Sequence, residues 1–407
     1  MSRSTERSRL ADTTRESGGS HIFWSGGESA GVRTGHSRGR ASGRSQVTKG
    51  AVIVPWGRTC ARAAVGTGLA AWIFLGAGGA AAQTKTEKVL IHGPLAIRHQ
   101  SPIQLLFFQF VPERAVPLGH KQIRLRVDVA ETNSLTADTG QDGLSGRLDL
   151  EMTHANLQAR IGLGEDWEAG MDLPIIATHG GFMDGFIDRF EELIMYERSI
   201  RDREDRENTR NEFTYRVSRN GETVLQGDQG RVGVGDLALQ VKWAPPPFRE
   251  TGSTPAVAVR LALKVPTGDA DAALGSGHPD IGVGLAFEKT LTRWTLYGNL
   301  NATFPLGDRF AGSRLTVRPI YSGLLGAEYR ITTRLAFVGQ IGANSAPFRN
   351  TGLDFFDEWS DWSAFGLSWA LTPAFGLQWG IMENLITLAD AGADFGFFLS
   401  ASYRFSP

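Results

Sequence analysis

Apolar and polar residues alternate strictly along much of this chain, and this period constrains the fold more than any other feature. In the stretch QIRLRVDV, Ile123, Leu125, Val127 and Val129 share one side, and the residues between them are polar or charged. A period of two is typical of a β-strand, because successive side chains point to opposite faces. The pattern recurs in twelve segments: about 121–130, 147–163, 166–178, 232–244, 255–266, 278–290, 293–304, 318–331, 333–345, 362–371, 373–382 and 392–405.

Most of these segments are near the length of about ten residues with which a tilted strand crosses a bilayer. One face of each is rich in large apolar side chains, and the other consists largely of Gly, Ser, Ala, Gln, Asn and charge. Glycine supplies 50 of 407 residues, about 12% against a usual ~7%, which argues against a helix-rich protein. The sequence therefore predicts an all-β fold, a membrane-spanning antiparallel β-barrel of about 12 strands.

The alternative fold is a secreted β-sandwich or a soluble barrel with the apolar face turned inward. The connections argue against it, because short turns alternate with long loops, as in outer-membrane barrels. Four aromatic residues fall at the predicted short-turn ends of strands, where an interface girdle is expected: Trp167, Trp243, Trp294 and Tyr329.

The N-terminal part has a different composition from the barrel. Residues 1–46 are rich in Ser, Gly, Arg and Thr, so we expect a disordered extension or an upstream segment read in error. Residues 47–82 combine a basic flank, a short apolar centre and the end Ala80-Ala81-Ala82, which predicts a signal peptide; a membrane anchor is the alternative. Residues 83–118 form a pre-barrel segment and residues 119–407 the barrel. Export and fold together predict the outer membrane of a Gram-negative-type bacterium.

Charge and cysteine content exclude several functions. Residues 83–407 carry 39 acidic and 31 basic side chains, so no nucleic-acid partner is expected. Cys60 is the only cysteine, which leaves the barrel without a disulfide or a Cys-based zinc site. No cofactor, catalytic residue or metal site is predicted. The expected partners are outer-membrane lipids, small solutes, and the barrel-assembly machinery through the last strand, which ends in Tyr403-Arg404-Phe405.

Charged residues of both signs occupy the polar faces of the predicted strands. They set ion preference if the barrel is an open pore, or pair with one another if it is closed. A narrow or occluded lumen is favoured, because about 12 strands leave little interior space. The apolar stretch around Leu105–Phe108 either plugs this lumen, sits in its mouth or packs against the rim. The lumen-facing candidates are Arg124, Arg126, Asp128, Asp149, Glu151, Asp236, Lys242, Arg260, Lys264, Glu288, Glu328 and Arg330.

The longest loop, residues 179–231, contains two predicted elements. Residues 182–196 form an amphipathic helix with an acidic polar face, which favours a position at the pore mouth over one on the lipid surface. Residues 212–226 form a hairpin around Asn220-Gly221. In segment 147–163 the apolar face changes phase near residues 153–156, which predicts a bulge or a strand that leaves the membrane. The constriction candidates on the helix are Phe182, Asp184, Phe186, Asp188, Phe190 and Glu191.

Four stretches resemble an uncharacterised bacterial family, domain of unknown function 3187. They are GPLAIRHQSPIQLLFF (93–108), HGGFMDGFIDRF (179–190), GVGDLALQVKW (233–243) and LKVPTGD (263–269). The resemblance implies an outer-membrane protein and implies no activity.

These patterns predict an outer-membrane barrel that acts as a narrow or gated porin-like channel or transporter for small solutes. The alternatives are a non-transporting barrel with a structural or surface-interaction role and, less favoured, a lipid-modifying enzyme. His154 lies alone in its strand with no Ser or acid partner evident, so the sequence does not predict an enzyme.

Overall fold

The computed structural model describes residues 92–183, 185, 211–310, 315–384 and 393–406, all within one compact unit. Its helical turns are η1 (Gln104–Leu106), η2 (Pro246–Phe248) and α3 (Asp354–Asp357). Its strands are β1 (Ile123–Thr139), β2 (Leu144–Gly162), β3 (Trp167–His179), β4 (Thr214–Arg219), β5 (Glu222–Gln226), β6 (Val232–Val234), β7 (Leu237–Trp243), β8 (Ala256–Val265), β9 (Asp280–Leu291), β10 (Trp294–Pro305), β11 (Ile320–Arg330), β12 (Leu335–Asn344), β13 (Ser360–Ala370), β14 (Phe375–Glu383) and β15 (Phe395–Phe405).

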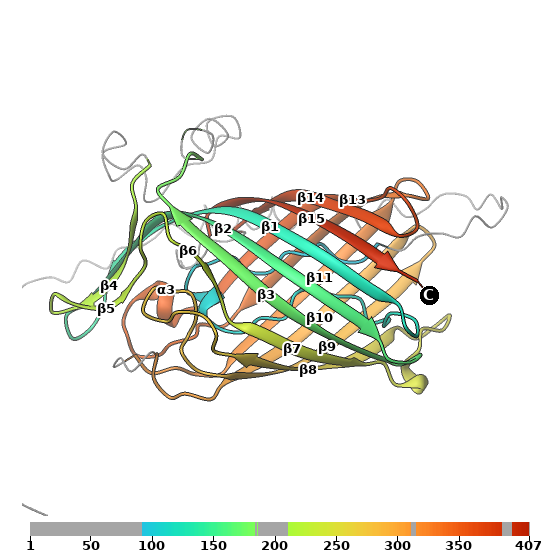
Figure 1. Ribbon diagram of the computed structural model, residues 1–407, viewed down its shortest axis with the longest axis horizontal. Coiled ribbons are helices and arrows are strands. Elements are labelled where there is room, and N and C mark those ends of the chain that lie inside the picture. The colour runs from blue at the N-terminus through green and yellow to red at the C-terminus, as the bar shows by residue number, and fades with distance from the viewer. Residues whose placement is uncertain (1–91, 184, 186–210, 311–314, 385–392, 407) are drawn as a thin grey trace, which may run out of the picture. The chain divides into compact units, whose positions relative to one another are not determined.

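Twelve strand positions close into an antiparallel ring (Figure 1). Each strand from β7 to β15 pairs with the next, β15 pairs with β1, and β1 continues through β2 to β3. β7 pairs with the first part of β3 (residues 167–172) and β6 pairs with the later part (residues 175–177), which completes the ring. The prediction of a membrane-spanning barrel of about 12 strands is therefore confirmed.

The two faces of the wall follow the alternation in the sequence. Leu261 is 54% exposed, whereas its neighbour Ala262 is 7% exposed and faces the interior. At the short-turn end, Trp167 stacks on Trp243 with ring centroids 5.5 Å apart. An apolar outer surface with aromatic rings at its edge is the pattern of a barrel in a bilayer.

β1 and β2 are longer than predicted and continue beyond the ring. Residues 131–139 are mostly polar on both faces, so the apolar–polar alternation that identifies a strand is lost there. The extension of β2 pairs with β4, and β4 pairs with β5. The turn uses Asn220 (φ 51°) and Gly221 (φ 85°), as a two-residue hairpin turn requires, so the predicted hairpin is confirmed.

β2 is a regular strand near residues 153–156, where the sequence predicted either a bulge or a strand that leaves the membrane. Its register with β1 runs without a shift from Ser145 to Ile161. Leu157 and Ile161 are exposed on the outer face, whereas Leu148 and Leu150 lie on the other face in a buried apolar cluster. The apolar residues change face because the surroundings of the strand change along its length. Asp149 and Glu151 consequently lie on the outward face, and their expected lumenal position is wrong.

No helix among the described residues is long and apolar enough to cross a membrane. The expected extension 1–46 and signal peptide 47–82 lie outside the described residues. The same holds for most of the predicted loop helix, including Asp184, Phe186, Asp188, Phe190 and Glu191.

Candidate functional site

Residues 92–118 run inside the ring of strands and are called the lumenal segment below (Figure 1, blue). Gly93 and Leu118 both contact the wall at the short-turn end, near the ends of β11 and β3. Gln104 in η1 donates to the carbonyl of Ser345, which follows β12 at the opposite end. The segment therefore rises through the lumen, turns at η1 and returns to the end from which it came.

The first limb is held through its backbone by polar side chains of the wall. The amide of Gly93 donates to Glu328 (3.1 Å), and that of Leu95 donates to Gln340 (3.0 Å). The amide of Ala96 donates to Gln378 on β14 (3.1 Å). An irregular chain buried in the lumen needs such partners, because unpaired amides away from water are costly.

The apex of the segment joins apolar packing to polar anchors. The ring of Phe107 meets that of Phe348 edge-on, with centroids 5.6 Å apart. Lys264 donates to the carbonyl of Leu106 (3.1 Å), and the amide of Phe108 donates to Asp280 (2.7 Å). The hairpin strand β4 adds Tyr215, whose hydroxyl donates to the carbonyl of Pro102 (3.4 Å).

Tyr215 lies outside the membrane-spanning strands and is fully buried. Burial raises the pKa of its hydroxyl above the ordinary value of tyrosine. The side chain therefore stays neutral and keeps its proton for the apex of the lumenal segment.

The returning limb carries the strongest charge pairs. Arg114 binds Glu288 on β9 with two parallel contacts, Nη2 to Oε1 at 2.6 Å and Nε to Oε2 at 3.0 Å. Glu113 is surrounded by three cations: its carboxylate lies 3.0 Å from Arg160 Nε, 3.3 Å from Lys242 Nζ and 3.5 Å from Arg124 Nη2. Such buried charges are tolerable only when they are paired.

Most of the predicted lumen-facing residues lie along this segment. Lys242, Arg260, Lys264, Glu288 and Glu328 bind it directly, and Arg124 approaches Glu113. Three others pair within the wall: Arg126 and Asp128 lie 3.0 Å from each other, and Asp236 lies 2.8 Å from Lys264. Arg330 lies at the short-turn end of β11, where its backbone amide donates to the carbonyl of Arg293 (2.9 Å).

The sequence analysis missed the partners that complete this network, namely Arg160, Asp172, Glu168 and Glu113. Arg160 binds both Glu113 and Asp172 and is almost fully buried. Arg160 and Asp172 alternate with the outward-facing residues of their predicted strands, so the alternation could have placed both in the lumen. For Arg160 the apparent phase change in β2 hid this position.

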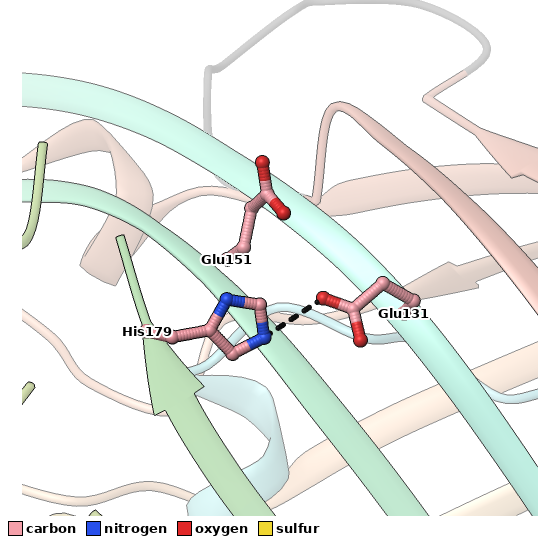
Figure 2. Close-up of side chains that lie close together, drawn as sticks. All are labelled: Glu131, Glu151 and His179. Carbon is pink, nitrogen blue, oxygen red and sulfur yellow. Dashed lines mark ion pairs between the residues drawn. The ribbon is translucent and has the colours of Figure 1, made fainter. Parts of the chain in front are cut away.

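A second polar group lies on the outward face of β1, β2 and β3, where Glu131, Glu151 and His179 meet (Figure 2). The imidazole Nε2 of His179 is 3.0 Å from Glu131 Oε1. Thr153 donates to the other oxygen of Glu131 at 2.5 Å. Carboxylates and imidazole are zinc-type ligands, and one such atom from each of the three residues lies within 4.8 Å of the others. Sequence reasoning missed this group, because strand register alone brings the three residues together.

In this structure the outward group holds the chain that follows β3. Glu151 accepts the amides of Phe182 (2.8 Å) and Met183 (2.5 Å). Met183 is buried against Phe395 on β15, whose outward neighbour Phe397 is exposed. The start of the long loop therefore crosses the outside of β2 and β1. Phe182 is 72% exposed there, so its expected position in a lumenal constriction is wrong.

The model of one protein family, described as a protein of unknown function (DUF3187), matches residues 73–405. The chain belongs to this family. The match spans the lumenal segment and the whole barrel, so both are part of what the family shares with this chain. No curated protein matches the chain in sequence.

Several solved barrels resemble this chain at low identity. The COG4313 outer membrane channel from Pseudomonas putida F1 is 16% identical (TM-score 0.49), with 73% of this chain and 100% of that chain covered. The NanC porin is 8% identical (TM-score 0.37), with 70% and 100% covered. A Pseudomonas aeruginosa FadL homologue is 10% identical (TM-score 0.32), with 78% and 99% covered. These values say nothing about what the present chain binds or transports.

Proposed function

We propose that this protein is an outer-membrane channel for small solutes, closed at rest by its own lumenal segment. The observation that supports this is the path of residues 92–118 through the ring, with hydrogen bonds or ion pairs to most of the wall strands. The segment is held both by apolar clusters and by hydrogen bonds and ion pairs to the wall. Water can replace these hydrogen bonds and ion pairs when the segment moves.

Opening requires the limbs of the segment to leave the wall. Both limbs end at the short-turn end, which faces the periplasm in barrels of this kind. Withdrawal toward that side would expose the charges that now hold the segment, among them Lys242, Arg260, Glu288 and Glu328. These side chains would then line the water path and set its preference for solutes.

The long loop after β3 is given no gating role in this proposal. Its described start, Phe182–Met183, follows the outer surface of the barrel and does not enter the lumen. The gate is assigned to the lumenal segment instead. Residues 47–82 are proposed as the export signal that directs the chain to the outer membrane.

The test is the conductance of the purified protein in planar bilayers. The double variant Glu113→Gln/Arg114→Gln removes the ion pairs of the returning limb. We expect brief, rare openings for the unsubstituted protein and a larger open fraction for this variant. The matched control is Glu165→Gln/Arg249→Gln, which removes an exposed ion pair in the turns and should conduct like the unsubstituted protein.

The alternative function is a non-transporting barrel with a structural or surface role, for which the paired interior is the favouring observation. It predicts no current for either double variant, although both migrate as folded barrels on unboiled gels. Absence of current from the folded Glu113→Gln/Arg114→Gln variant would overturn the channel proposal. Phospholipid hydrolysis without current would favour the enzyme alternative.

A further inference from the structure

A cavity of about 280 Å³ opens at the short-turn end, between the two limbs of the lumenal segment and strands β1, β14 and β15. Its charged lining is unbalanced. Four arginines, Arg114, Arg124, Arg126 and Arg404, line it, together with a single carboxylate, that of Glu113.

Strand register concentrates positive charge at this place. Arg124 stands directly opposite Arg404 on β15 and directly opposite Arg160 on β2. Like charges on facing positions of neighbouring strands destabilise a sheet. Arg160 is compensated by Glu113 and Asp172. Arg124 Nη2 lies 3.5 Å from Glu113 Oε1, and this carboxylate also pairs with Arg160 and Lys242. The Nε and Nη2 of Arg124 make no hydrogen bond among the described residues.

Arg126 is the second incompletely paired cation. Its side chain is 9% exposed, and its Nε is 3.0 Å from Asp128. Its Nη2 is buried and donates no hydrogen bond within the described part of the chain. Asp128 is shared, because the hydroxyl of Ser400 also donates to it at 2.5 Å. A buried guanidinium with a free donor beside a cavity is costly unless an acceptor can enter.

We propose that this cavity binds a small anion carrying a carboxylate or phosphate group, held between Arg124 and Arg126. A guanidinium presents parallel donors that match two oxygens of either group. Arg404 stands at the rim, where it donates to the carbonyl of Pro373 (2.7 Å), and adds attraction for the anion. The inference deepens the proposed function by naming the class of solute, but binding in the cavity does not require the lumenal segment to move.

The experiment is isothermal titration calorimetry on the full-length purified barrel in a zwitterionic detergent at low ionic strength. The probes are inorganic phosphate and succinate, which separate a phosphate site from a carboxylate site. We expect saturable binding of at least one probe. Arg124→Gln and Arg126→Gln should each weaken it by about tenfold or more, because each removes charge-assisted hydrogen bonds.

Two further variants separate the site from general effects. Arg126→Lys keeps the positive charge but loses the two parallel donors of the guanidinium. Its affinity for the probe should therefore fall between those of the unsubstituted protein and Arg126→Gln. Arg249→Gln removes an exposed arginine outside the cavity and should bind as the unsubstituted protein does. Equal binding by all variants, or no binding of either probe to a barrel folded on unboiled gels, would overturn the proposal. Binding without conductance would contradict the channel function alone.

Discussion

Glu113 and Arg160 are buried ion partners that belong to different parts of the barrel, the carboxylate to the lumenal segment and the guanidinium to β2. Arg160 Nε lies 3.0 Å from Glu113 Oε1, and the two side chains are 1% and 2% exposed. The pair links the returning limb to the wall at a point where water is excluded. The same carboxylate also serves Lys242, so its loss would leave several cations without a shared partner.

Glu113→Gln should loosen the lumenal segment. Removing one partner of a buried pair typically costs about 3–5 kcal/mol, because the remaining charge stays buried and unpaired. We expect a larger open fraction in planar bilayers. Arg114→Gln should have a smaller effect, since the Arg114 side chain is already 25% exposed. An open fraction for Glu113→Gln equal to that of the unsubstituted protein would contradict the role given to this pair.

Leu261→Arg and Ala262→Arg should act on different properties, although the two residues are neighbours. Leu261 faces outward and is 54% exposed, so arginine there should cost roughly 2–4 kcal/mol if the residue lies near the bilayer midplane. Unfolding by urea in lipid vesicles measures this loss. Ala262 packs against Phe108 and Phe110, so arginine there should displace the lumenal segment and raise conductance. The same loss of stability for both, without a change in current, would contradict the assignment of faces.

Gly181→Ala should release the start of the long loop from the outer surface. Gly181 has φ +85°, and a Cβ there would lie 2.0 Å from the carboxylate carbon of Glu151. We expect faster tryptic cleavage between residues 189 and 210. Gly185→Ala is the matched control, because no atom lies within 4 Å of a Cβ at that position. Equal cleavage rates for the two variants would show that the contact with Glu151 does not hold the loop.

Phe405→Ala tests the proposed recognition of the last strand by the barrel-assembly machinery. Phe405 is 48% exposed on the outward face, and its ring meets that of Tyr403 with centroids 4.6 Å apart. We expect less protein in the outer-membrane fraction and more unfolded precursor, while the purified variant still refolds in detergent. Ser406→Ala, one residue further on, should assemble normally. Poor refolding of Phe405→Ala in detergent would point to a structural defect instead.

Alternation was enough to predict the twelve wall strands, because a strand between lipid and a polar interior must repeat every two residues. The alternation no longer identified the faces of a strand where the strand was not placed between lipid and a polar interior. Leu148 and Leu150 lie on the same face of β2 as Arg160, yet they pack into an apolar cluster under the lumenal segment. The pattern predicted either a bulge or a strand that leaves the membrane, and β2 is a regular strand that continues beyond the ring and changes environment along its length.

The candidate site depended on pairings that sequence does not encode locally. Gly93 and Glu328 are 235 residues apart and meet only because the ring closes around the segment. The apolar run at Leu105–Phe108 indicated burial but left three locations open. Glu131, Glu151 and His179 could be placed together only with the register of three strands in hand.

The return of the lumenal segment to its starting end determines how it would respond to mechanical force. Tension on the chain ahead of His92 would load the contact of Gly93 first and those of Leu95 and Ala96 afterwards. Contacts that break one after another need a lower peak force than contacts sheared together. The rings around Phe107 would resist next, and the charge pairs of Glu113 and Arg114 on the returning limb would resist last. A steady pull from the periplasm would therefore first free one limb and then, at a higher load, the whole lumen.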